Sequence, residues 1–88
     1  MRRIYNYYSE IIVREVPKST LGYRVLGRAI FGVGRKIVEI AKELKGYLKF
    51  EVLTHELMHL KYPNLSEYEI RIKTRLRLLE LGINPKLH

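Results

Sequence analysis

The residues with the clearest chemical potential are His55, Glu56 and His59, which form the pattern H-E-x-x-H. On a helix, residues i and i+4 lie on one face, so both imidazoles can reach the same ion. Glu56 lies about 100° further round the helix than His55, where it can reach a metal-bound water without being a ligand itself. The pattern predicts a zinc site, held by His55 and His59, in which Glu56 acts as the general base.

A catalytic zinc ion needs a third protein ligand and an open position. The chain has no Cys and no Asp, so that ligand must be His88 or a Glu. Glu69 is the first choice because it falls on a stripe that helical spacing predicts to face the core, where an unpaired carboxylate is costly. The stripe consists of Leu65, Glu69, Ile72, Leu76 and Leu79. The rival role for Glu69 is a capping box with Ser66, and Glu67 is the alternative third ligand.

Two helices are expected to position these residues. Residues 48–61 read as one helix, and Pro63 ends it. Its apolar stripe is predicted to face the core and to leave the histidines facing a cleft. The stripe consists of Phe50, Leu53, Leu57 and Leu60. A second helix is expected from about Ser66 to about Leu81, with Gly82 suited to the C-terminal cap.

The segment before the helices is predicted to form a small sheet. Residues 3–16 are rich in Tyr, Ile and Val, which favours a strand, although their spacing also suits a helix. Residues 23–31 and 35–41 read as two further strands joined by a tight turn. The expected fold class is α+β, with a mostly antiparallel sheet of about three strands followed by the two helices.

Length and composition indicate the number of domains, the kind of partner and the cellular location. We expect 88 residues to form a single domain, 1–88, whose last residues, 83–88, are a short tail. The net charge of +8 is spread over the whole chain, which favours a solvated surface over a nucleic-acid partner. No segment has the pattern of a membrane span or a signal peptide, so a cytoplasmic protein is expected. Self-association is compatible with the sequence.

VLTHELMHL, followed by a second helix that bears Glu, resembles the gluzincin metallopeptidases. The small size resembles the minigluzincins, which are minimal versions of the catalytic domains of integral-membrane CaaX-protease-type enzymes. The resemblance includes GRAIF and RKIVEIA as strands and SEYEIR as the start of the second helix. It implies a zinc peptidase that is kept latent by a covered cleft. The membrane relatives have an E-x-x-A-D pattern in which Glu67 would be the first residue, but Arg71 replaces the Asp; if Glu69 is used, Lys73 replaces it.

Two further regions could contribute to such a site. Ala29, Ile30 and Phe31 could form a sheet edge that pairs with an extended peptide substrate, or they could be purely structural. The tail could fold back so that His88 fills the fourth zinc position, or it could be a frayed terminus. The competing functions are a zinc-stabilised scaffold without catalysis and a basic nucleic-acid-binding module.

Overall fold

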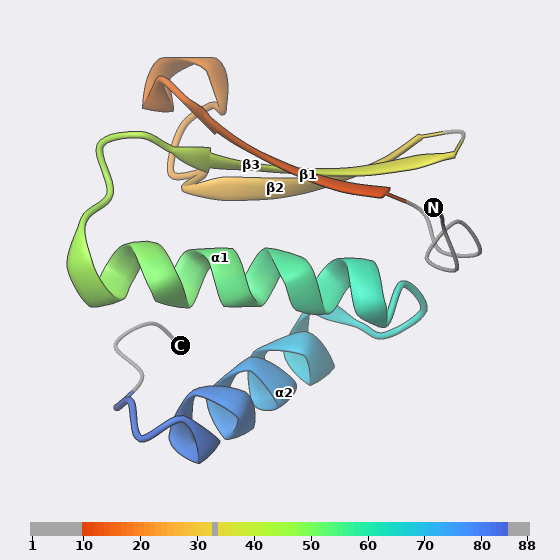
Figure 1. Cartoon of the computed structure of the whole chain (residues 1–88), viewed down its shortest axis with the longest axis vertical. Coiled ribbons are helices and arrows are strands. Elements are labelled where there is room, and N and C mark those ends of the chain that lie inside the picture. The colour runs from red at the N-terminus through yellow and green to blue at the C-terminus, as the bar shows by residue number, and fades with distance from the viewer. Residues whose placement is uncertain (1–9, 33, 85–88) are drawn as a thin grey trace, which may run out of the picture.

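Three strands precede two helices in the computed structural model, which describes residues 10–32 and 34–84 (Figure 1). The elements are β1 (Glu10–Val16), a 3-10 turn η2 (Lys18–Thr20), β2 (Gly27–Gly32), β3 (Arg35–Ala41), α1 (Gly46–Lys61) and α2 (Glu67–Glu80). The predicted α+β class and the predicted order of elements are confirmed. The second strand begins only at Gly27, because Tyr23 and Arg24 form a turn in which Arg24 adopts the left-handed region at φ 63°, and residues 25–26 are irregular.

The sheet is mixed, with β3 between β1 and β2. β2 and β3 form the expected antiparallel hairpin, in which Ile30 pairs with Ile37. β1 runs parallel to β3, with Ile12 opposite Ile37. The antiparallel character that we predicted therefore holds for one of the two strand pairs. Since β3 is central, both β1 and β2 are edge strands.

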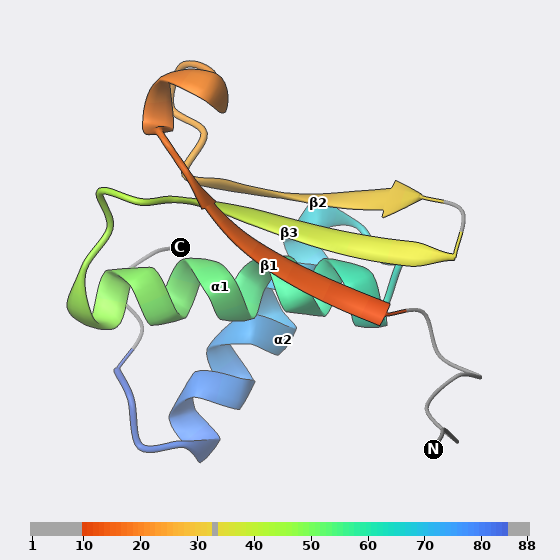
Figure 2. The ribbon, with the colours of Figure 1, turned by 45° about the horizontal axis from the view of Figure 1, so that its top comes forward.

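The fold has three layers, with α1 in the middle (Figures 1 and 2). The sheet lies on one side of α1, which packs against β2 and β3, and most of α2 lies on the other side. Alternate residues of β3, Val38 and Ile40, are almost fully buried. From α1, Val52 and Leu60 join them in the core. Among the described residues, no helix has the length and apolar content needed to cross a bilayer.

Helix α2 begins with the predicted capping box, in which Ser66 and Glu69 satisfy each other's backbone N–H groups. Its buried face consists of Ile70, Thr74 and Leu78. The prediction that the opposite stripe faces the core is wrong, because Ile72 and its neighbours along that stripe are exposed. Helix α2 packs mainly against α1, and its second apolar stripe is exposed.

The apolar stripe of α1 is only partly buried. Phe50 is exposed, Leu53 and Leu57 are half-buried, and Leu60 is buried. Because α1 lies between two layers, its buried residues also include the polar Glu51, Thr54 and Glu56. The histidine face of this helix borders a cleft as expected, because His55 and His59 line a pocket.

Candidate metal centre

One turn of α1 presents both histidines to the same point in space. The Nε2 atoms of His55 and His59 are 3.2 Å apart, and the ring centroids are 4.9 Å apart. This follows from the i, i+4 spacing, which stacks the two side chains on one face of the helix. Burial lowers the pKa of His55, although the negative charge of Glu67 acts in the opposite direction. A lowered pKa keeps the His55 imidazole neutral, which is the form that binds metals.

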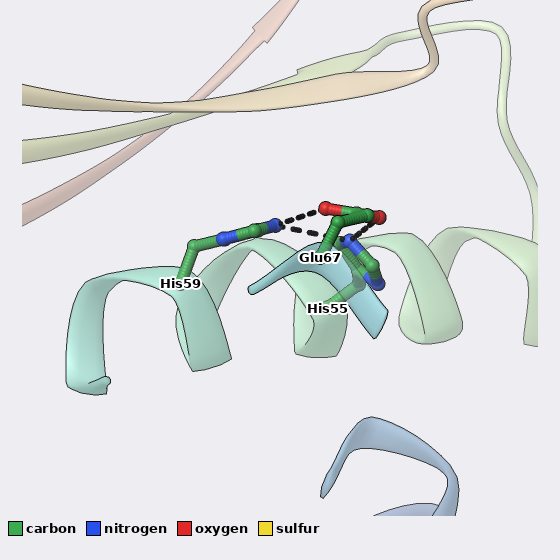
Figure 3. Close-up of side chains that lie close together, drawn as sticks. All are labelled: His55, His59 and Glu67. Atoms are coloured by element: carbon green, nitrogen blue, oxygen red, sulfur yellow. Dashed lines mark hydrogen bonds and ion pairs between the residues drawn. The ribbon is translucent and has the colours of Figure 1, made fainter. Parts of the chain in front are cut away.

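The carboxylate of Glu67, in the first turn of α2, completes the group (Figure 3). Its Oε1 lies 2.8 Å from Nε2 of His59, and its Oε2 lies 2.9 Å from Nε2 of His55. Among residues 10–32 and 34–84, these are the only three His, Cys, Asp or Glu side chains whose ligand atoms gather in this way, all within 4.8 Å of one another. Of the two glutamates considered for the third position, the structure brings Glu67 to the histidines.

Glu69, the first choice for the third ligand, points elsewhere. It is exposed, and its Oε1 accepts a hydrogen bond from the Ser66 backbone N–H at 3.0 Å. Its own N–H donates to Oγ of Ser66 at 3.1 Å. Hydrogen bonds from the Ser66 backbone, and then from its side chain, lower the pKa of Glu69. Two residues correspond to about 200° round a helix, so Glu67 and Glu69 cannot serve the same site.

The three side chains fit a metal ion. Zinc bonds to nitrogen and oxygen of about 2.0–2.1 Å with tetrahedral angles would place two ligand atoms about 3.3 Å apart. The two Nε2 atoms are 3.2 Å apart, and one ligand atom from each of the three side chains lies within 4.8 Å of the others, so modest rotations of the side chains would bring them to this geometry. Two histidines and a glutamate are also the donor set of one class of catalytic zinc site. The cluster could therefore hold a metal ion.

Glu56 lies in the same turn of α1 and is buried. Burial raises the pKa of Glu56 to about 7, an effect that the nearby Glu67 strengthens and that His59 opposes. Gly27 of β2 passes directly over this residue: a Cβ atom at Gly27 would lie 3.2 Å from Cγ of Glu56 and 2.8 Å from Cγ1 of Val52. The absence of a side chain at Gly27 thus lets the edge strand approach α1 beside Glu56.

A pocket of about 550 Å³ lies between β2, α1 and α2. It is lined by the two histidines, Glu56, Glu67 and Gly27. Ala29 and Phe31 contribute to its wall, whereas Ile30 does not. Side chains alternate along a strand, so Ile30 points to the opposite face of the sheet. Arg71 also borders the pocket, and its Nε lies 3.3 Å from Oε2 of Glu67.

Two pocket residues escaped the sequence analysis. Gly27 falls within the predicted strand 23–31 without a special role there, because its close contact with α1 depends on how the layers pack. Thr74 belongs to the buried face of α2, and its hydroxyl is buried without a hydrogen-bond partner. The sequence did contain a signal for Thr74: it lies four residues after Ile70 and four before Leu78, so it is a polar residue on an otherwise apolar face of the helix.

His88, the candidate for the fourth position, lies outside the described residues, as does the segment 3–9 of the first predicted strand. Comparison of the chain with protein-family models, with curated proteins and with solved structures finds no match.

Proposed function

We propose that this protein is a zinc-dependent metallopeptidase of the gluzincin type. The observation that carries the proposal is the convergence of His55, His59 and Glu67 on one point, with the buried carboxylate of Glu56 on the same helical turn. The pocket that contains them is bordered by the edge strand β2. Ligands, a proton acceptor and a surface for an extended peptide therefore occur together.

Zinc suits this site better than the other common ions. Magnesium and calcium prefer shells made of oxygen ligands, whereas zinc accepts imidazole nitrogen together with one carboxylate. A bound zinc ion supplies Lewis-acid chemistry, which polarises a carbonyl and acidifies water. His55, His59 and Glu67 would hold it and leave one position open towards the pocket.

Glu56 is proposed as the group that moves the proton. It accepts a proton from the attacking water and later returns it to the nitrogen of the leaving amine. A general base works best when its pKa is near the working pH, and the pKa of about 7 meets this condition. The burial that raises this pKa is a property of the α1–sheet interface, because Glu56 lies under Gly27.

The edge of β2, which pairs with no further strand among the described residues, is proposed to bind the substrate backbone. An edge strand has unpaired N–H and C=O groups, and an extended peptide can add to them as a further strand. Ala29 and Phe31 face the pocket and would contact the substrate's side chains. A peptide bound there would pass beside the histidines and Glu56.

The first test is hydrolysis of a quenched fluorescent peptide library by the purified, zinc-loaded protein. We expect cleavage that a chelator abolishes and that added zinc restores. Stoichiometric zinc without cleavage of any peptide would favour the scaffold without catalysis. Absence of zinc binding would refute both functions.

A matched pair of variants identifies the third ligand. Glu67→Gln removes the negative charge at the cluster, so zinc affinity should fall at least about tenfold. Glu69→Gln has the same chemistry two residues away, on the exposed capping box, and should leave zinc affinity unchanged. Competition with a chromophoric chelator measures both affinities. Equal affinities for the two variants would contradict the assignment of Glu67.

A further inference from the structure

Helix α2 carries a second apolar stripe that faces away from the domain. Four residues form this outer seam: Tyr68, Ile72, Leu76 and Leu79, which are 72%, 42%, 56% and 49% exposed. The seam lies opposite the buried face of the helix. Leu76 and Glu67 are nine residues apart, which places them about 180° from each other round α2. The seam is thus a separate surface from the metal cluster.

The spacing within the seam is that of a helix-pairing surface. Ile72, Leu76 and Leu79 follow one another at intervals of four and three residues, the pattern that repeats in coiled coils. Single exposed apolar residues are ordinary on a protein surface. A continuous row of large apolar residues with this periodicity, rimmed by charges, instead marks a contact surface for another helix.

We propose that a second copy of this chain covers the outer seam, with the two α2 helices antiparallel about a two-fold axis at Leu76. In this arrangement Leu76 meets its counterpart, and Ile72 meets Leu79 of the other copy. At the flank of the seam, Lys73 falls opposite Glu80 of the other copy, so that the charges complement each other twice in the pair. A surface that is its own complement in this way fits a symmetric dimer.

The antiparallel direction follows from the charge at the start of the seam. Glu69 lies three residues before Ile72 and so occupies the next position of the same row towards the N-terminus. A parallel pair would place Glu69 beside Glu69 of the other copy, which is unfavourable for two like charges. The antiparallel pair separates these two carboxylates. Lys73 Nζ lies 4.5 Å from the centre of the Tyr62 ring, and Glu80 lies 3.5 Å from Arg77, so both side chains would turn towards the other copy to pair.

The contact is small, so the dimer should be weak. Helix α2 has 14 residues, which correspond to a length of about 21 Å. Such an interface is below the size of most stable complexes, and we expect dissociation constants on the order of micromolar or weaker. The equilibrium should not depend on metal, because Glu67 is on the far side of α2.

Sedimentation velocity of the full chain from about 1 to 300 µM tests the proposal. We expect a concentration-dependent dimer. Leu76→Glu should weaken it at least about tenfold, because two carboxylates would meet at the axis. Leu81→Glu is the matched control, since Leu81 is 45% exposed but lies on another side of α2, and it should keep the dimer. Ile72→Gln is a second seam variant, and melting curves verify that each variant is folded.

Charge reversal tests the direction of the helices. Lys73→Glu and Glu80→Lys should each weaken the dimer, and the double reversal should restore it. Restoration supports the antiparallel pair, and failure to restore overturns it. A monomer at every concentration, or a dimer that Leu76→Glu leaves intact, overturns the whole proposal.

Discussion

Two glutamates of this protein are buried to nearly the same degree, and their surroundings are opposite. Glu39 of β3 is 6% exposed and Glu56 of α1 is 9% exposed. The Glu39 carboxylate accepts hydrogen bonds from Arg14 of β1 at 2.8 Å and from Arg28 of β2 at 2.7 Å. Among the described residues, the Glu56 carboxylate has no ion pair with any Lys or Arg. Burial raises the pKa of Glu56 to about 7.

The difference separates a carboxylate whose charge is paired from one whose charged form is disfavoured. Glu39 lies opposite Arg14 and Arg28 in the strand register, so it links all three strands through charges that satisfy each other. The charged groups that act on Glu56 are His59 and Glu67, and burial disfavours its charged form. An unpaired buried acid costs stability, and such sites are where proton transfer is commonly found. Glutamine substitutions at the two positions turn this contrast into measurements.

The largest difference should be in catalysis. Glu56→Gln removes the proposed proton acceptor and should lower kcat/KM for peptide cleavage by about 10²- to 10⁴-fold while zinc remains bound. Glu39→Gln should retain most of the activity, since Glu39 is not among the residues that line the pocket. Initial rates at equal zinc loading provide the comparison. Similar losses in both variants would mean that Glu56 acts through the fold and not on the substrate.

The next difference should be in stability. Glu39→Gln removes the acceptor charge for two arginines that are each about half exposed, so we expect a loss of about 1–2 kcal/mol. For a domain of this size, that corresponds to a fall in Tm of roughly 5–15 °C. Thermal melts of the metal-free protein followed by circular dichroism measure it. An unchanged Tm would show that the bridges across the sheet contribute nothing net.

The third difference should be a gain in stability that depends on pH. The folded pKa of Glu56, about 7, exceeds the ordinary value of 4.5. Between these values the folded state holds a proton that the unfolded state has lost, so stability falls as pH rises. Glu56→Gln should therefore stabilise the metal-free protein at pH 8, by up to about 3 kcal/mol for a pKa shift of this size, and by nothing at pH 4. His55 is present in both proteins, so its titration cancels in the difference. A gain of equal size at both pH values would contradict this origin.

Local signals in the sequence predicted much of this architecture. The capping box of α2 depends on residues three apart, and the histidine pair of α1 on residues four apart, so both follow from helix geometry alone. The choice between Glu67 and Glu69 depends on how far α2 is rotated against α1. The apolar stripe pointed to the wrong rotation, because α2 has two apolar faces and the longer one is turned outward.

Non-local features were beyond the reach of such patterns. The parallel pairing of β1 with β3 joins segments separated by the whole β2 region, and strand composition does not specify the partner. The approach of Gly27 to Glu56 likewise arises only once the sheet has been laid on α1. The residues of the candidate metal cluster could therefore largely be predicted from the sequence, whereas the pocket that surrounds them could not.

The insertion of β3 between the other two strands has a consequence for the order of assembly. The β2–β3 hairpin closes over a short turn, with Gly32 opposite Arg35. In contrast, β1 pairs with β3 only after a loop of 25 residues has closed, since Glu10 lies opposite Arg35. Loop closure over a longer distance costs more chain entropy, and β1 has no place to pair before β3 is positioned. The first strand of the chain should thus be the last to dock and the first to leave when the protein is pulled from its N-terminal end.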